Sequence, residues 1–428
     1  MQSRSSSFQA VQNYLAIRRD PIGFLSNIVR EQGDFARFKL LTFPYVLVNE
    51  PALIREALVN QSDALIIRGG TSAGLARLIG HGILTNRGQE WQASRKALQP
   101  LFHGSAFEQY IRTIEVRVDE SLARWRGQAP GTSVDIQHEL LALSFRVMCS
   151  TLFRWLPTFD DASTFAAAMR ILQTDGMNRY FMGGDLMPWW PSSRNRRIAG
   201  ACSALRDLAR SAATHATGLS VDEIRSLLFA GTESPVNTVC FALVLLEDHP
   251  EWLDRIRGTD RSGEADRDGT PSAATDALTQ VLCESLRLFP AGWAFERFAT
   301  RDADLGGRPI RRGERLLFSP FLLHRNAGLW KDPERFDPTR FAADPGGNGA
   351  MHRQGYLPFG AGPRSCIGSR LALAEMRIVL NALARRCRWK TVRDADEQPL
   401  TAEGSFKIRL SRPHCIQLEV IQAASRSP

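Results

Sequence analysis

The chain has 428 residues, 43% of them hydrophobic, which is enough to bury a large core. It carries 54 lysines and arginines against 45 aspartates and glutamates, a formal net charge of +9 that is spread along the chain without a basic tract. A diffuse basic excess favours anionic partners in general. It gives little support to nucleic-acid binding, and we find no motif of a groove-reading helix or an aromatic sheet.

Seven cysteines are scattered along the chain, and no two of them form a CxxC pair. This spacing argues against zinc ribbons, thioredoxin-type redox sites and c-type haem attachment, and against a disulfide framework. The N-terminal twenty residues hold no apolar run of the length that a signal peptide needs. The most apolar internal run, FALVLL, is too short to span a bilayer. We therefore expect a soluble, cytoplasmic protein without a membrane anchor.

Helical periodicity dominates the predicted elements. Strands are predicted near the start at 35–41 and 45–49, and near the end at 406–411 and 415–420. Long amphipathic helices are predicted at 106–125, 221–249 and 370–389, and a polar solvated loop at 258–273. The pattern predicts one compact domain over residues 1–428, mainly α with a smaller β portion.

Two helical segments carry residue pairs that lie on one face. Trp91 and Arg95 are four residues apart in EWQASR, and Glu284 and Arg287 are three apart in ESLR. Taken alone, the first pair suits an ordinary amphipathic helix face. The second suits a solvated ion pair that stabilises the chain by under about 1 kcal/mol.

The segment FGAGPRSCIG at 359–368 surrounds one cysteine with three glycines, a proline and an arginine. A helix is predicted to follow, so Cys366 lies near a helix N-terminus, where the dipole and free N–H groups favour a thiolate. Arg364 suits a forked contact with a carboxylate, and Phe359 would close the site against water. A haem iron with one thiolate ligand and two propionates meets these requirements together. The alternative is a buried structural cysteine in a loop before a helix.

This decapeptide, with its pattern FxxGxRxCxG, resembles the haem-binding signature of the cytochrome P-450 monooxygenases, and further motifs follow in the family's order along nearly the whole chain. The resemblance implies the cytochrome P-450 fold, a triangular α-rich body with small β-sheets. It implies haem b with the Cys366 thiolate as axial ligand of the iron. It also implies contacts to the haem from Trp91, Arg95, Ala230, Gly231, Arg297, Phe359, Gly360, Arg364 and Gly368.

The resemblance gives Glu284 and Arg287 a different meaning. In the family such a pair is joined by an arginine from a later segment to form a buried network behind the haem. Arg340 in FDPTRF is the implied third member, and His324 and Trp330 match the approach to that segment.

The segment LLFAGTESPVNTV is similar to the family's oxygen-activating helix, in which an acid and an alcohol relay protons. Here these are Glu233 and Ser234, where serine replaces the family's threonine and lacks the methyl group that fixes its rotamer. Pro235 cannot donate to the Gly231 carbonyl, so we predict a kink that builds the oxygen groove; the alternative is a kink without function. Ser234 is expected to bond the Ala230 carbonyl through its side chain. The connection before this helix is short for the family, and an element that many relatives carry there is reduced or missing.

The implied activity is hydroxylation or epoxidation of a hydrophobic small molecule such as a terpenoid, fatty acyl chain or polyketide, using O₂. Electrons would come ultimately from NAD(P)H through a separate ferredoxin- or flavodoxin-type partner docking on a basic face, and we expect a monomer. Two alternatives stay open: a haem-thiolate enzyme that performs oxidative coupling or isomerisation, and a haem-binding protein without catalysis. Candidate pocket residues, each of which could equally belong to the core, are Leu227, Ala230, Trp293, Ala294, Phe295 and Phe406.

Overall fold

The structure is a computed structural model that describes residues 7–67, 70–102, 106–127, 129, 132–176, 192–216, 218–258, 276–342, 355–392, 401–404 and 407–421. Phe406 lies outside the described residues, and so does the predicted loop at 258–273 apart from its first residue.

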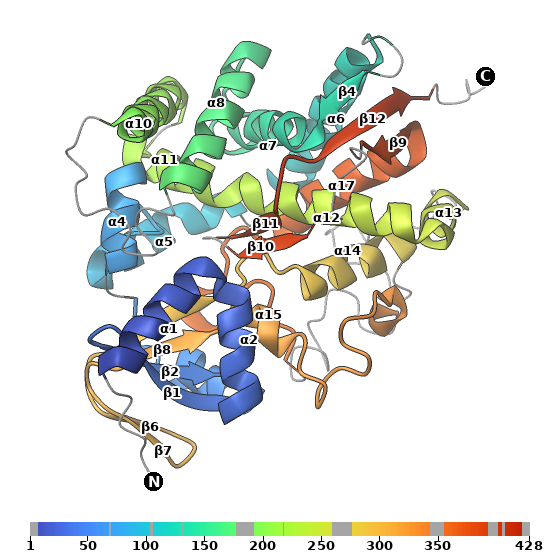
Figure 1. Cartoon of the computed structure of the whole chain (residues 1–428). Helices are drawn as coiled ribbons and strands as arrows, with labels where there is room; N and C mark the ends of the chain where they lie inside the picture. The colour runs from blue at the N-terminus through green and yellow to red at the C-terminus, as the bar shows by residue number, and fades with distance from the viewer. Residues whose placement is uncertain are drawn as a thin grey trace.

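Helices form most of the body (Figure 1). Several are apolar on nearly every face, as expected for helices buried on all sides: in α7 thirteen of the seventeen residues are buried. The α-helices are α1 Ser7–Arg19, α2 Pro21–Gln32, α3 Pro51–Arg55, α4 Gly70–Ile79, α5 Gly88–Leu98, α6 Ala106–Arg126, α7 Ile136–Leu152, α8 Phe159–Ile171, α10 Ser193–Ala213, α11 Val221–Gly231, α12 Glu233–Asp248, α13 Pro250–Gly258, α14 Ala277–Leu288, α15 Pro320–Leu323 and α17 Ser369–Arg386. Short π- and 3₁₀-helical turns are η1 Glu56–Asn60, η2 Gln99–Phe102, η3 Leu172–Gly176, η4 Pro338–Phe341 and η6 Gly362–Arg364.

The strands form small sheets, and the largest has the order β1-β2-β8-β5-β3. Only the β2–β8 pair in this sheet is parallel. A three-stranded sheet has the order β4-β12-β9, and β6–β7 and β10–β11 form separate two-stranded pairs. The strands are β1 Phe35–Leu40, β2 Phe43–Val48, β3 Leu65–Ile66, β4 Ser133–Asp135, β5 Phe295–Ala299, β6 Ala303–Leu305, β7 Arg308–Ile310, β8 Arg315–Phe318, β9 Cys387–Thr391, β10 Ala402–Gly404, β11 Ile408–Leu410 and β12 Cys415–Val420.

The mainly α prediction with a small β portion is therefore confirmed, and α6 lies where a helix was predicted. Two boundaries differ from the prediction. The helix predicted at 221–249 is interrupted at Thr232, which separates α11 from α12. The helix predicted at 370–389 ends at Arg386, because Cys387 begins β9 and pairs with Val420 of β12. The apolar spacing continues across that boundary, so periodicity alone did not reveal the change.

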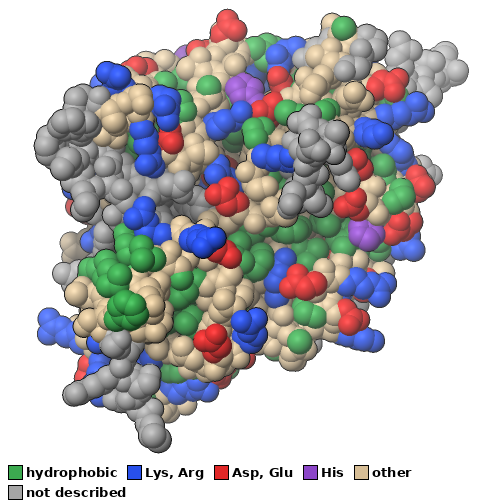
Figure 2. Space-filling view, viewed as in Figure 1, with side chains coloured by type: hydrophobic (Ala, Val, Ile, Leu, Met, Phe, Trp, Pro, Cys, Tyr) green, Lys and Arg blue, Asp and Glu red, His purple; other side chains and the backbone are tan. Residues whose placement is uncertain are grey.

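Two hydrophobic clusters fill the interior. The larger lies among the helices, and the smaller packs beneath the main sheet around Val46, Leu316 and Phe318. Together α11 and α12 are long and apolar enough to cross a bilayer, but 78% of their most apolar stretch is buried inside the protein, as in a core helix. On the face in Figure 2, acidic and basic side chains are interspersed.

Three segments that are far apart in the sequence meet at the centre of the molecule. The α11–α12 junction lies beside the β10–β11 pair, and α12 packs against α17 (Figure 1). A seven-residue connection, 214–220, joins α10 to α11. The loop that precedes α17 carries Cys366.

Candidate active site

The cysteine loop is shaped by its own backbone. The N–H of Cys366 donates to the carbonyl of Phe359 at 2.9 Å, and Gly360 and Gly362 have φ angles of +69° and +70°. A Cβ atom at Gly362 would collide with the carbonyl oxygen of Leu58 in η1. Glycine is therefore required at 362 for both reasons, the left-handed φ and the close approach. Cys366 lies three residues before α17, whose N-cap is Gly368.

The Cys366 side chain is exposed by its accessible area although protein atoms surround it on nearly all sides. That combination describes a group that faces an internal hollow. Burial raises the pKa of the Cys366 thiol, while the N–H of Gly368 and the charges of Arg95 and Lys407 lower it in part. The stabilisation of the thiolate predicted from the sequence is therefore present, but it lowers the pKa of Cys366 less than burial raises it. Binding to a metal cation would remove the thiol proton.

Four arginines gather beside this loop. Burial and, to a smaller extent, the neighbouring charges of Arg297, Arg95 and Arg87 together lower the pKa of Arg364 to about 10. Arg364 stacks on Trp91, 3.9 Å from the ring centre, and donates to the carbonyl of Asn86.

The partners of these arginines show whether the site is suited to hold a haem. Arg95 donates to the carbonyl of Ser365 at 2.8 Å, and Arg297, whose pKa burial lowers to about 10, donates to the carbonyl of Glu296. Within the described part of the chain, Arg95, Arg297 and Arg364 form no ion pair with a carboxylate. Like charges at half-buried and buried positions need an anionic partner. A thiol facing a hollow beside them suits a group with two carboxylates and a thiolate-binding iron, so the residues fit haem.

Glu284, Arg287 and Arg340 lie together behind the loop. Glu284 and Arg287 are fully buried and 2.7 Å apart, and Arg340 lies 3.5 Å from the Glu284 carboxylate. Arg287 also donates to three main-chain carbonyls, those of His324, Pro333 and Arg335. The network therefore joins α14 to the segment that leads to the cysteine loop.

His324 links this network to the loop. Its Nδ1 lies 3.0 Å from the carbonyl of Arg287, and its Nε2 accepts the N–H of Leu357 at 2.8 Å. Burial lowers the pKa of His324 to about 3, so the imidazole is neutral, with its proton on Nδ1. Trp330 packs beside it, with the Arg287 guanidinium 5.2 Å from the ring centre.

The α11–α12 junction brings the predicted acid and alcohol to the helix break. The Ser234 hydroxyl donates to the carbonyl of Ala230 at 3.4 Å. A Cβ atom at Gly231 would overlap the terminal methyl group of the Met148 side chain of α7, so the two helices lie close together at this position. Glu233 is 2% exposed, and its carboxylate lies 3.3 Å from the ammonium of Lys407, a residue that sequence motifs did not identify.

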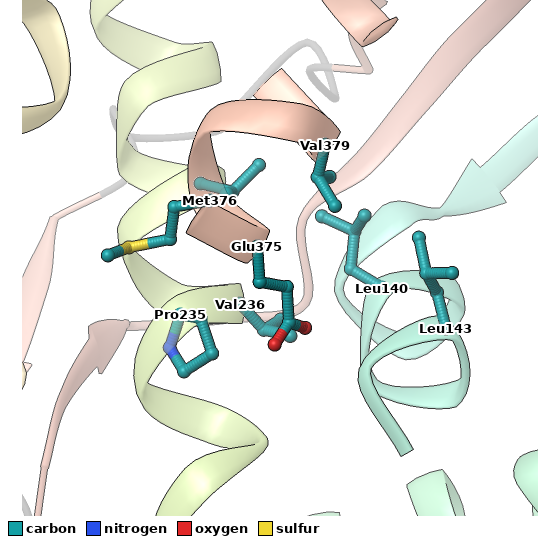
Figure 3. Close-up of a pocket in the computed structure, with 8 residues that line it drawn as sticks. Leu140, Leu143, Pro235, Val236, Glu375, Met376 and Val379 are labelled. Atoms are coloured by element: carbon teal, nitrogen blue, oxygen red, sulfur yellow. The ribbon is translucent and has the colours of Figure 1, made fainter. Parts of the chain in front are cut away.

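A second buried acid was also missed. Glu375 of α17 projects into a small cavity between α7, α12 and α17, beside Leu140, Pro235 and Val236 (Figure 3). Burial raises its pKa to about 8, and nearby Ser144 offsets only part of this effect. Glu375 lies nine residues after Cys366, but only the packing shows that the acid faces inward.

The predicted pocket residues separate into two groups. Leu227 and Trp293 are 4% and 2% exposed and belong to the larger core cluster. Ala230, Ala294 and Phe295 are half-buried and keep accessible surface.

Comparison with known proteins agrees with this geometry. The cytochrome P450 family model matches residues 5–217 and 219–416. Cyclooctat-9-en-7-ol 5-monooxygenase of Streptomyces melanosporofaciens is 30% identical over 88% of this chain and 87% of its own length. Pentalenene oxygenase of Streptomyces avermitilis is 26% identical, covering 89% and 90% of the two chains.

Solved structures give the same answer. The crystal structure of CYP175A1 from Thermus thermophilus superposes with a TM-score of 0.77 at 25% identity, covering 98% of this chain and 99% of the other. The chain belongs to the cytochrome P450 family.

Proposed function

We propose that this haem-thiolate monooxygenase oxidises a cyclic terpenoid, with Glu233 and Ser234 delivering protons and a separate ferredoxin or flavodoxin supplying electrons from NAD(P)H. Bound haem supplies the iron centre at which O₂ is reductively cleaved, and the Cys366 thiolate pushes electron density toward it. The observation that carries the proposal is the Cys366 side chain beside Arg95, Arg297 and Arg364, which form no ion pair with a carboxylate in the described part of the chain.

The substrate class rests on the relatives and on the half-buried apolar residues. The two Streptomyces relatives carry names of terpenoid oxygenases. Ala294 and Phe295 offer apolar surface without a charge that would favour an ionised substrate. Hydroxylation or epoxidation of a hydrocarbon framework fits such walls, which also exclude water from the reacting centre.

Proton delivery rests on the position of the acid and the alcohol. Glu233 is buried at the helix break and Ser234, the next residue, is half-buried, so a carboxylate and a hydroxyl adjoin the broken helix. A carboxylate that alternates between its two protonation states can pass protons from the interior to the neighbouring hydroxyl.

Electron supply from a separate protein suits the charge of the chain. Arg370 is exposed in the first turn of α17, four residues after Cys366, and an acidic partner would be attracted to such a surface. Reduction by a ferredoxin should therefore slow as salt rises, and Arg370→Glu should slow it further at low salt. A cytoplasmic monomer is the form in which we expect this exchange.

Two measurements test the proposal. The reduced protein with carbon monoxide should show the absorption of thiolate-ligated haem, and Cys366→Ser should abolish it, whereas Cys202→Ser on α10 should not. Cyclooctat-9-en-7-ol and pentalenene, the probes suggested by the relatives, should shift the haem spin state and yield an oxygenated product. A colourless protein, or a Cys366→Ser variant with unchanged spectrum and turnover, would overturn the proposal. Binding and oxidation of fatty acids in preference to both terpenoids would overturn the substrate class.

A further inference from the structure

Lys407 places a buried ammonium group inside the α11–α12 junction. The residue directly precedes β11 and is 8% exposed. Its Nζ donates to the carbonyls of Phe229 at 3.2 Å and Ala230 at 3.1 Å, and lies 3.3 Å from Oε2 of Glu233. An ammonium group has three N–H donors, and here three acceptors surround it.

The helix break explains why two carbonyls are available. In a continuous α-helix the carbonyls of Phe229 and Ala230 would accept the N–H groups of Glu233 and Ser234. The helix ends at Gly231 and resumes at Glu233, so carbonyls beside the break need other donors. Lys407 supplies them, and its positive charge suits the negative C-terminal end of α11.

A second contact fixes the same carboxylate. The amide nitrogen of Asn237 lies 3.4 Å from Oε1 of Glu233 and donates to the carbonyl of Ile408 at 3.0 Å. Gln137 of α7 in turn donates to the Asn237 side chain at 3.0 Å. The two oxygens of Glu233 thus have different partners, and both partners involve the β11 segment.

Charge decides what this arrangement can do. A carboxylate buried without a partner favours its neutral form, whereas an ammonium at 3.3 Å favours the ionised form. Burial lowers the pKa of Lys407, and the charges of Glu233 and Cys366 oppose that shift. Glu375 is the other nearby acid, and it faces α12 from α17 beside Pro235, the residue two positions after Glu233.

We propose that Lys407 is the positioning residue for proton delivery: it keeps Glu233 ionised and oriented at the break, ready to accept a proton from the interior. The inference rests on the proton-delivery role proposed for Glu233 above and adds the residue that controls its charge. The relay uses both states of the acid, because the carboxylate accepts a proton from the interior and then donates it to the Ser234 hydroxyl. Without the ammonium the neutral form is favoured, so the carboxyl group gives up its proton to the hydroxyl less readily.

The experiment compares Lys407→Met with Lys407→Arg and Arg409→Met in the haem-loaded protein. Arg409 is the matched control, because it lies on the adjoining strand β11 and forms its own pair with Glu403 at 3.0 Å. Glu375 contributes a protonated-carboxyl band at neutral pH in every variant. After the wild-type infrared spectrum is subtracted, an additional such band should remain in Lys407→Met alone, and Glu233→Gln added to that variant should remove it.

Turnover with pentalenene and cyclooctat-9-en-7-ol gives the second readout. Lys407→Met should divert about tenfold more NADH electrons to peroxide, with the defect shrinking as pH rises, because high pH ionises Glu233 again. Lys407→Arg keeps the charge and should restore the wild-type pH profile, and Arg409→Met should match wild type. If Lys407→Met does not fold, Lys407→Gln takes its place.

The outcomes separate the two proposals. A Lys407→Met protein with neither the band nor the altered pH profile overturns the role of Lys407, even if Glu233→Gln alone impairs turnover. If the band appears but Glu233→Gln leaves turnover unchanged, Lys407 does control the charge of Glu233, and the proton-delivery role of Glu233 is what fails.

Discussion

The two sides of the candidate site differ in whether recognisable sequence motifs supply the residues that hold them together. On the cysteine side, residues 355–368 and the network of Glu284, Arg287 and Arg340, the loop is held by contacts within itself and by groups that recognisable motifs supply. On the helix-break side, the α11–α12 junction with Lys407 and Glu375, the ammonium reaches Ala230 across 177 residues of sequence. Motifs therefore describe the first side well and the second only in part.

The largest expected effect is on the cysteine side. Glu284→Ala leaves Arg287 fully buried without its carboxylate, and we expect the free energy of unfolding to fall by about 3–5 kcal/mol. Urea unfolding of the haem-loaded protein measures the loss.

Glu334→Ala is the matched control for this variant. Glu334 pairs with Arg325 at 3.0 Å, but its side chain is 72% exposed, so the loss should stay below about 1 kcal/mol. Equal losses in the two variants would show that burial does not decide the strength of the cysteine-side network.

On the helix-break side, a substitution of the buried Glu375 should raise the free energy of unfolding instead of lowering it. Burial raises the pKa of Glu375 to about 8, against 4.5 for an ordinary glutamate. Between these values the folded protein keeps a proton that the unfolded chain has released, so wild-type stability falls as pH rises through this window. Glu375→Gln cannot titrate and should gain up to about 3 kcal/mol over wild type at pH 7.

The pH dependence is the decisive part of this test. Near pH 5, urea unfolding should give almost the same free energy of unfolding for Glu375→Gln and wild type. Near pH 8 the difference between the two proteins should be largest. A difference that is the same at both pH values would mean that the acid is ionised in the folded protein or that the substitution acts through packing.

A substitution in the arginine cluster should have a smaller effect, and it should weaken haem binding without destabilising the fold. Arg364→Met removes one of four neighbouring positive charges, so it relieves repulsion in the protein while removing a partner for a haem carboxylate. We expect haem to leave about tenfold faster, a change of about 1.4 kcal/mol, with no loss of stability in the haem-free protein. Transfer of haem to an excess of a haem-free globin measures the rate.

Arg370→Met is the control, because Arg370 also stacks on an aromatic ring, that of Phe107 at 4.0 Å, but lies outside the cluster. It should not change the rate of haem loss. A faster loss in both variants would point to general loosening of the cysteine side.

These contrasts show how much the sequence could predict. The helical class, the strands at both ends and the companions of Cys366 follow from periodicity and from motifs in which spacing fixes geometry. Pro235, whose missing N–H cannot serve the Gly231 carbonyl, predicted a kink in this helix, but the break into two helices at Thr232 was not predicted. The burial of Lys407 and Glu375 at the site could not be predicted. A charged residue on a short strand or an amphipathic helix is expected to face solvent unless its packing partner is known.

The smallest expected effect concerns the alcohol on the helix-break side. Ser234→Thr adds a methyl group that restricts χ1, and the long 3.4 Å bond from Ser234 to the Ala230 carbonyl shows how weakly the serine hydroxyl is fixed. Lys407 donates to the same carbonyl at 3.1 Å, so the hydroxyl shares its acceptor with the stronger ammonium donor. Holding the hydroxyl in one rotamer should raise the share of electrons that reach product by about twofold.

Ser234→Ala should lower that share, and Thr238→Ser, one turn further along α12, should leave it unchanged because its hydroxyl donates to the Ser234 carbonyl instead. A product yield that is lower in Ser234→Thr than in wild type would mean that the added methyl group collides with the broken helix. The rotamer of Ser234 would then be set by the shape of the break and by Lys407. Proton delivery on the helix-break side would in that case depend on a contact between distant segments rather than on the sequence motif alone.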